Sequence, residues 1–228
     1  MNIMDIMKKN AAIEAVKLVK DGMVVGLGTG STASFAIRFL AEKDLDITCV
    51  ATSKRSEELA RSFGLNVVDP NAVDYVDITI DGADEVDMHG NLIKGYGGAL
   101  TREKIIARMS KEEVIIVDET KVVEFLGQKG VLPVEILPFG WKHTIKLLRR
   151  YGDPVLRVVN SRPYITDNGN YIVDLRIKRI ENPREFEVEI NSLPGVVENG
   201  LFVDLATRII IAYKDLTVRT LEVKRKSL

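Results

Sequence analysis

The chain alternates between continuous apolar runs and segments in which apolar residues recur at helical spacing. The apolar runs predict strands at 23–27, 47–51, 67–68 and 114–117, and the strand-like run at 76–80 predicts another. The segments with helical spacing predict helices at 11–19, 33–40, 56–63 and 101–109. Strands that are apolar throughout and separated by helices are typical of a parallel sheet with both faces covered. We therefore predict an α/β protein with a Rossmann-like, mostly parallel sheet and helices on both faces.

The pattern changes after about residue 130. Strands are predicted at 132–136 and 155–159, on either side of a helix at 141–150. Residues 164–166 and 171–175 flank Asn168-Gly169, which is a strong hairpin signal. A further helix is expected to start at Asn182-Pro183-Arg184-Glu185 and to stop at Pro194-Gly195. This region is predicted to form a smaller α+β domain.

Two late strands, at 208–212 and 218–223, are expected to return to the first domain. We predict an α/β catalytic domain made of residues 1–130 and 206–228. The α+β domain, with a ferredoxin-like fold, is predicted to span residues 131–205 and to take part in oligomerisation.

Composition narrows the classes of partner. The 228 residues include 32 basic and 33 acidic side chains, so the net charge of −1 gives no attraction to nucleic acid or anionic lipid. The N-terminal apolar residues are interrupted by Asp5 and followed by Lys8 and Lys9, so neither a signal peptide nor a membrane span is expected. The one cysteine, Cys49, lies in an apolar run and cannot form an intrachain disulfide. A buried thiol and a reducing, cytoplasmic setting follow.

Polar clusters follow the predicted strands of the first domain. They are found at 28–32, 52–54, 81–84 and 118–121. Because the carboxyl ends of parallel strands share one edge of a sheet, we expect these clusters to converge there, where ligands of open α/β sheets bind.

The first cluster is a glycine loop. Gly28, Gly30 and Ala33 formally match the dinucleotide fingerprint, but the second strand ends in 52–54 without the acid that binds a ribose. A simpler anion site fits better: backbone N–H groups, the hydroxyls of Thr29, Ser31 and Thr32, and a helix N-terminus could hold a phosphate monoester. The alternative is a tight turn without a ligand.

The third cluster is acidic, with Asp81-Gly82-Ala83-Asp84-Glu85 followed by Lys94 and Glu103. Its spacing does not fit an EF-hand. His89 and His143 form no zinc pattern, so we expect no metal. Gly82 and Ala83 are small enough to let a ligand approach closely, whereas 87–91 has the composition of a solvated turn.

These motifs carry a resemblance to the type A ribose-5-phosphate isomerase family over nearly the whole chain. The matching segments are Gly28-Thr29-Gly30-Ser31-Thr32, Asp81-Gly82-Ala83-Asp84-Glu85, Lys94-Gly95-x-Gly97-Gly98-Ala99, Leu100-Thr101-Arg102-Glu103-Lys104, Leu132-Pro133-Val134-Glu135, Thr166-Asp167-Asn168-Gly169-Asn170 and Leu193-Pro194-Gly195-Val196-Val197. One departure is Tyr96, where the family usually has another glycine. A tyrosine adopts positive φ only at a cost. Either the loop needs no positive φ at this position, or its shape and backbone contacts differ slightly from those of the family.

The resemblance implies the reversible conversion of ribose 5-phosphate to ribulose 5-phosphate through an enediolate, in the pentose phosphate pathway and without a cofactor. It implies that Glu103 carries the proton between the carbon atoms and that Lys94 stabilises the negative charge on the substrate oxygens. It also implies that Asp81 moves protons among the hydroxyls, and that Asp84 binds a hydroxyl or orients Lys94. The implied substrate-binding residues are Thr29, Gly30, Ser31, Thr32, Gly82, Ala83, Gly95, Tyr96, Gly97, Lys121 and Lys9, with Lys8 as a weaker candidate than Lys9. It also suggests a homodimer or a homotetramer.

Two other classes stay open from the sequence. A sugar-phosphate sensor would keep the phosphate loop without needing Glu103. A nicotinamide-dependent oxidoreductase is disfavoured by the missing acid after the second strand.

Overall fold

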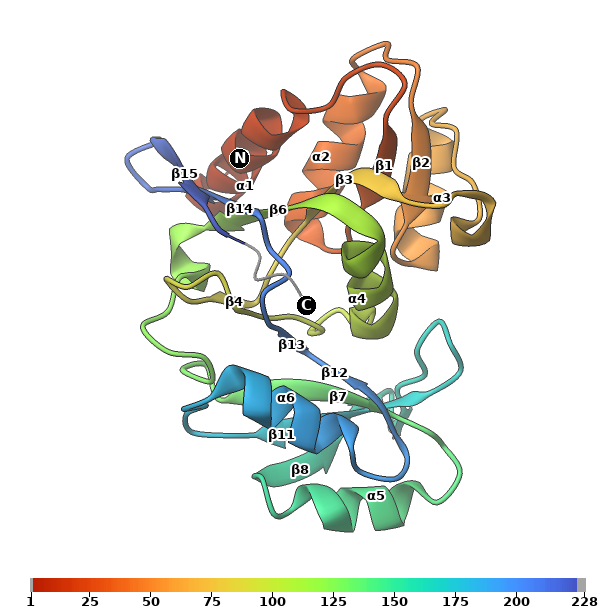
Figure 1. Ribbon diagram of the computed structural model, residues 1–228, viewed down its shortest axis with the longest axis vertical. Helices are drawn as coiled ribbons and strands as arrows, with labels where there is room; N and C mark the ends of the chain where they lie inside the picture. Colours follow the sequence, from red (N-terminus) through yellow and green to blue (C-terminus); the bar gives the residue numbers. More distant parts are fainter. Residues whose placement is uncertain (1, 225–228) are drawn as a thin grey trace. The chain divides into compact units, whose positions relative to one another are not determined.

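A computed structural model describes residues 2–224 in two compact units (Figure 1). The first unit comprises the chain up to Ala83, Arg102–Val122 and the chain from Asp204 onward. The second comprises Asp84–Thr101 and Val123–Val203. The division differs in extent from the expected domains, because the short strands within Asp84–Thr101 pair with a strand at 201–202.

The first unit contains a six-stranded sheet in the order β15-β14-β6-β3-β1-β2. Its strands are β1 (Val24–Leu27), β2 (Thr48–Ala51), β3 (Val76–Asp81), β6 (Ser110–Asp118), β14 (Arg208–Ala212) and β15 (Val218–Glu222). All neighbours are parallel except β14 and β15. Leu27 lies opposite both Ala51 and Ile80, so β1, β2 and β3 end at one edge of the sheet.

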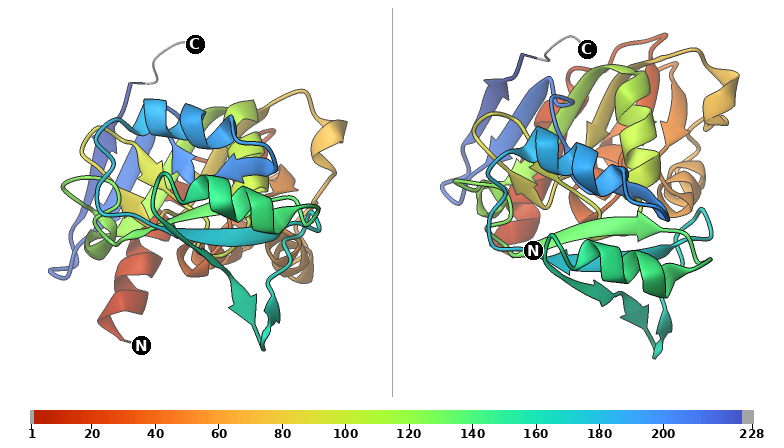
Figure 2. Two further views of the ribbon diagram at one scale, coloured as in Figure 1. Left: turned by 90° about the horizontal axis from the view of Figure 1, so that it is seen from below. Right: turned by 60° about the horizontal axis from the view of Figure 1, so that its bottom comes forward.

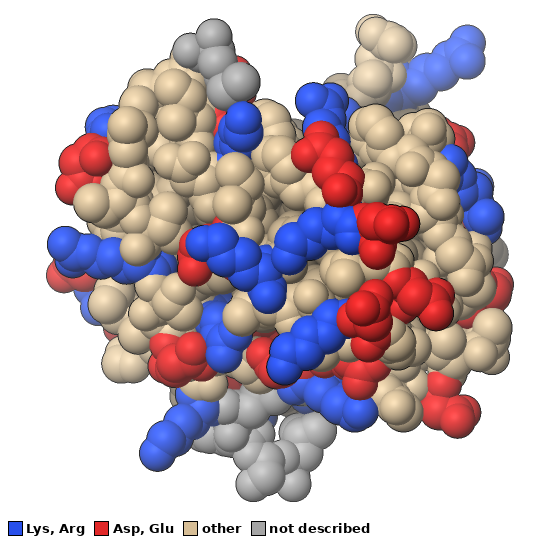
Figure 3. Space-filling view, turned by 90° about the horizontal axis from the view of Figure 1, so that it is seen from above, with Lys and Arg blue, Asp and Glu red and all other residues tan. Residues whose placement is uncertain are grey.

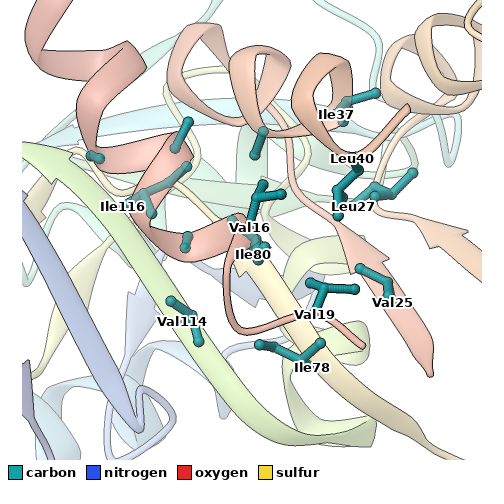
Figure 4. Packing of buried hydrophobic residues seen from close by; sticks show 14 of the residues in the cluster. Val16, Val19, Val25, Leu27, Ile37, Leu40, Ile78, Ile80, Val114 and Ile116 are labelled. Atoms are coloured by element: carbon teal, nitrogen blue, oxygen red, sulfur yellow. The ribbon is translucent and has the colours of Figure 1, made fainter. Parts of the chain in front are cut away.

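Helices cover both faces of this sheet. They are α1 (Ile3–Val16), α2 (Ser31–Ala41), α3 (Lys54–Ser62) and α4 (Leu100–Met109), whose last eight residues belong to the first unit. Side chains of α1 and α2, such as Val16 and Ile37, pack on Leu27 and Ile80 in the main core (Figure 4). Ile106 of α4 packs in a separate cluster with Val50. The predicted Rossmann-like fold is confirmed.

The second unit contains a four-stranded antiparallel sheet in the order β12-β7-β11-β8. The chain runs through β7 (Val131–Ile136), α5 (Trp141–Leu148), β8 (Asp153–Leu156), β11 (Tyr171–Arg176), α6 (Pro183–Asn191) and β12 (Val196–Asn199). This βαββαβ sequence is the ferredoxin-like arrangement that we predicted. Leu148 of α5 and Ile190 of α6 share one core cluster with the sheet, and both helices lie along it in Figure 2.

Short elements complete both units. They are β4 (Glu85–Val86), β5 (Leu92–Ile93) and β13 (Leu201–Phe202), the hairpin β9 (Val158–Val159) and β10 (Arg162–Pro163), and the 3-10 turns η1 (Pro70–Ala72) and η2 (Glu119–Lys121).

Four local expectations were wrong in their extent. The first helix begins at Ile3 rather than near residue 11, because the Asn2 side chain accepts from the Asp5 N–H and caps it. The strand expected at 155–159 is interrupted at Arg157. The segments expected at 67–68 and 164–166 each make only an isolated bridge.

The distribution of charged side chains on the surface agrees with the nearly equal numbers of basic and acidic residues. On the face in Figure 3, basic and acidic side chains lie next to each other. No helix in the described part of the chain has the length and apolar character needed to cross a membrane.

Candidate active site

The glycine loop leads into α2 at the carboxyl end of β1. Gly30 is the N-cap residue of α2 and supplies no side-chain cap. The first N–H groups of a helix have no intrahelical acceptor, and the helix dipole favours an anion near them. Ser31 is exposed and Thr32 half-buried at this turn. The loop therefore has the features of an anion cradle.

Thr29 joins this loop to the end of the neighbouring strand. Its Oγ1 lies 2.8 Å from both Thr52 Oγ1 and Ser53 Oγ, and 3.2 Å from Ser56 Oγ. Ser56 in turn donates to the carbonyl oxygen of Gly28 at 2.7 Å. The hydroxyl of Thr29 thus stiffens the loop. Ser56 was missed from the sequence, because a helical serine carries no signal of such a role.

Asp81 lies on the other side of the loop, at the end of β3. Its Oδ1 accepts from the N–H groups of Thr29 at 3.0 Å and Gly82 at 2.7 Å, and the residue is fully buried. Gly28 makes this approach possible: a Cβ there would lie 2.5 Å from the Cα of Asp81. The cradle and the first acid of the acidic motif are therefore directly connected in the first unit.

Glu103 lies in the first turn of α4, and only 5% of its surface is exposed. The helix follows β3 and leads directly into β6, which is parallel to β3. Such a helix runs antiparallel to the strands, so its N-terminal turn is at their carboxyl edge. This is the edge that carries the cradle and Asp81.

The two further lysines of the first unit differ in position. Lys121 is half-buried in η2, directly after β6. Lys9, in α1, has its ammonium nitrogen 5.8 Å from the ring centroid of Phe39 in α2. Phe39 lies about two turns from Thr32 along that helix.

The second unit carries Asp84 and the loop that begins at Lys94. Asp84 Oδ2 accepts from the Tyr96 N–H at 3.0 Å, and the Asp84 N–H donates to the carbonyl of Ile93 at 2.8 Å. Lys94 is only 2% exposed, and its ammonium nitrogen lies 5.4 Å from the ring centroid of Phe202. A buried ammonium over an aromatic ring is a compact local source of positive charge.

Tyr96 fits this loop without strain. Positive φ angles fall at Gly95 (107°) and Gly98 (77°), and Tyr96 is not among the positive-φ residues of the described chain. Burial raises the pKa of the Tyr96 phenol, and the carboxylates of Asp84 and Glu85 raise it further. The tyrosine is therefore neutral at physiological pH, and the loop keeps its turns on glycines.

Several residues that hold this loop were missed from the sequence. Arg157 donates to its backbone from the break between β8 and β9, with Asp174 and Tyr164 nearby. Glu85, the last residue of the acidic motif, is fully buried and holds a different segment, because it accepts from the N–H groups of Gly127 and Lys129, both at 2.7 Å. No local pattern distinguishes such side chains from solvated ones. Among the described residues, no group of three or more His, Cys, Asp or Glu side chains could hold a metal ion.

The fold and these residues define an α/β protein with an anion cradle and buried acids at the carboxyl edge of its sheet. The family model "Ribose 5-phosphate isomerase A (phosphoriboisomerase A)" matches residues 48–216. Ribose-5-phosphate isomerase A of Dinoroseobacter shibae is 47% identical, covering 100% of this chain and 92% of its own. That of Pyrococcus abyssi is 45% identical, covering 97% and 100%. The chain belongs to the ribose-5-phosphate isomerase A family.

Solved structures agree with this assignment. Ribose 5-phosphate isomerase from Plasmodium falciparum superposes with a TM-score of 0.94 at 39% identity, covering 97% of this chain and 100% of that one. A D-ribose-5-phosphate isomerase in complex with phospho-erythronic acid superposes with a TM-score of 0.93 at 44% identity, with the same coverage.

Proposed function

We propose that this chain interconverts D-ribose 5-phosphate and D-ribulose 5-phosphate through an enediolate. Its membership of the isomerase family supports the reaction. The observation that carries the proposal is the hydrogen bond between the Thr29 N–H and Asp81, which joins an anion cradle to a buried acid at a sheet edge. The reaction redistributes electrons within one sugar, so it requires no external oxidant or reductant and no redox cofactor.

The phosphate is assigned to the loop of Thr29, Gly30, Ser31 and Thr32. The open N–H groups at the start of α2 support this assignment, because they suit a dianion. Lys121, and less directly Lys9, would add positive charge to the same group. Gly82 and Ala83 leave room for the sugar next to Asp81.

Glu103 is assigned the transfer of the proton between carbon atoms. It would take the proton from C2 of the open-chain aldose, leaving the electron pair in the enediolate, and return the proton to C1 to give the ketose. Its burial supports this role, because a carboxylate with little hydration is a stronger base than one in water. Asp81 would move protons among the sugar hydroxyls, including during ring opening.

The charge that develops on the substrate oxygens is assigned to Lys94 and to the N–H groups of Gly95 and Gly97, because the Tyr96 N–H already donates to Asp84. Fixed donors of this kind lower a barrier because they need no reorganisation as charge forms, and one donor is worth about 3 kcal/mol. Asp84 would bind a hydroxyl or orient the Lys94 ammonium. Its bond to the Tyr96 N–H supports a place beside this loop.

The test compares Glu103→Gln with the wild-type enzyme in an absorbance assay for ketose formation, in the presence of a chelator. We expect the variant to lose at least about 100-fold in kcat while substrate affinity stays within about tenfold, because the base acts on the barrier. Glu58→Gln, at an exposed position of α3, is the matched control and should keep wild-type kinetics. Wild-type turnover in Glu103→Gln would exclude this role, and no turnover by the wild-type enzyme would exclude the function.

The proposal extends to assembly and location. A homodimer or homotetramer formed through the ferredoxin-like unit is supported by its exposed apolar side chains, including Phe139 at 92%, Val158 at 58% and Val159 at 53%. Sedimentation of the purified protein would test it, and a monomer at micromolar concentration would contradict it. A cytoplasmic setting is supported by the free, buried thiol of Cys49.

A further inference from the structure

Arg157 interrupts the edge of the ferredoxin-like sheet and is held there by Asp174. Its backbone N–H donates to the carbonyl of Ile172 at 2.8 Å. Its guanidinium forms a two-point ion pair, with Nε donating to Asp174 Oδ2 at 2.9 Å and Nη2 donating to Oδ1. The two side chains are only 15% and 27% exposed. A bidentate pair of this kind fixes the plane of the guanidinium.

The remaining nitrogen of this guanidinium holds the loop after Lys94. Nη1 donates to the carbonyl oxygens of Gly95 and Tyr96, both at 3.1 Å. The next carbonyl, that of Gly97, accepts from the Tyr164 hydroxyl at 3.3 Å. Three successive carbonyls are therefore bound by side chains from the β8–β11 region, which is distant in sequence.

Fixing the carbonyls also fixes the N–H groups. In a trans peptide the C=O and N–H bonds point in opposite directions. The peptide from Gly95 to Tyr96 obeys this rule: its carbonyl binds Arg157, and its N–H binds Asp84 at 3.0 Å. The next peptide has its carbonyl on Arg157 as well, so the Gly97 N–H is directed away from the guanidinium. Gly97 is exposed, and within residues 2–224 its N–H has no acceptor.

We infer that Arg157 is a positioning residue for the isomerisation: together with Asp174 it orients the Gly97 N–H toward the oxyanion of the enediolate. The inference rests on the proposed function. The guanidinium also polarises the two peptides whose carbonyls it binds, which increases the positive charge on their N–H groups. Arg157 itself touches no substrate atom in this role.

Arginine is needed here for its shape. A lysine would keep the positive charge, but its single nitrogen cannot bind both oxygens of Asp174 and both loop carbonyls at once. Arg157→Lys is therefore expected to lower kcat by about 10- to 100-fold with KM within about threefold. This is less than the roughly 100- to 1,000-fold loss on removal of an oxyanion donor, because the donor is misaligned and not removed.

The surroundings of Arg157 allow a chemical rescue. The side chain lines an open cavity of about 390 Å³, together with Tyr96, Val131, Val155, Asp174 and Arg176. Guanidinium ion added at millimolar concentration can enter the space left by Arg157→Ala and bind the same acceptors. We expect it to restore kcat at least fivefold, whereas equal concentrations of sodium chloride or urea should not.

Arg176→Ala is the matched control. Arg176 lines the same cavity, but its ion pair with Asp153 is 3.7 Å long and both partners are more than half exposed. It should keep wild-type kcat and show no response to guanidinium.

The outcomes separate the two proposals. An inactive wild-type enzyme overturns the function and this inference together. An active wild-type enzyme whose Arg157→Lys variant keeps kcat within twofold overturns the inference alone. A rise in KM at unchanged kcat also overturns it, because it would assign Arg157 to substrate binding. If Arg157→Ala does not fold, Arg157→Lys and Asp174→Asn decide by the same criterion, which is a fall in kcat while KM stays within about threefold.

Discussion

Replacing Glu135 with glutamine should destabilise the ferredoxin-like unit far more than an isosteric change usually does. Glu135 lies in β7 and is fully buried. Its carboxylate accepts four hydrogen bonds from neutral side chains: Thr101 Oγ1 at 2.5 Å, Thr166 Oγ1 at 3.0 Å, Asn168 Nδ2 at 3.1 Å and Asn170 Nδ2 at 2.8 Å. These donors come from the start of α4 and from the turn after β10.

The magnitude follows from the charge. A hydrogen bond to a charged group contributes about 1.5–3 kcal/mol and a neutral one about 0.5–1.5 kcal/mol, so each bond weakens by about 1 kcal/mol in Glu135→Gln. The amide nitrogen also replaces one acceptor. The lower cost of burying a neutral amide offsets part of this loss. A net loss of about 3 kcal/mol remains, which corresponds to about 6–12 °C in Tm for a chain of this size.

The assay is urea unfolding followed by circular dichroism. Glu189→Gln, at an exposed position of α6, is the control and should stay within about 0.5 kcal/mol of the wild-type protein. Adding Thr101→Ala to both backgrounds measures the coupling, which we expect at about 1.5 kcal/mol. A Glu135→Gln variant within 1 kcal/mol of the wild-type protein would show that the network is neutral and would refute the reasoning.

Two further predictions concern single positions of the first unit. Gly28→Ala should prevent folding or cost more than about 3 kcal/mol, because its Cβ would lie 2.5 Å from the Cα of Asp81. Gly82→Ala, whose Cβ would have its nearest contact at 3.9 Å, should leave the urea midpoint unchanged. Equal midpoints for the two variants would contradict this argument. Burial raises the pKa of the Cys49 thiol to about 12, so Ellman's reagent should react only with the unfolded protein. The thiol of the unfolded chain ionises near pH 8.5, so this contribution to stability should be complete below that pH and fall by about 1.4 kcal/mol per pH unit above it; a fast reaction of the folded protein would overturn the burial argument.

The parallel sheet could be predicted because strands that are buried on both faces consist mainly of apolar residues. Runs such as Val114–Val117 are apolar without alternation, and the polar residues that follow them identify the edge at which strands end. The hydrogen bond from the Thr29 N–H to Asp81 shows that two of these clusters meet. Strand order and register were not needed for that expectation, because any parallel arrangement brings carboxyl ends to the same edge.

The short strands of the second unit and the side chains that hold its loops could not be predicted, for a physical reason. Strands of two residues, such as β4 and β13, are too short to show a period. Arg157 lies 62 positions from Gly95, and its sequence neighbours give the pattern of an uninterrupted strand. Only the tertiary fold determines that its guanidinium has carbonyl acceptors rather than water.

The proposed roles divide between the two units in a way that should be visible in kinetics. The cradle and Glu103 belong to the first unit, whereas Lys94 and the loop held by Arg157 belong to the second. The chain passes between the units four times, and the first two passages, after Ala83 and after Thr101, each lie within three residues of a proposed catalytic acid. Ser31→Ala combined with Thr32→Ala would remove contacts proposed for the phosphate, which are equal in the ground state and the transition state, so KM should rise while kcat holds. Loosening the loop at Arg157 acts only where negative charge develops, so kcat should fall while KM holds. One substrate would then report on the two units separately, through two different constants.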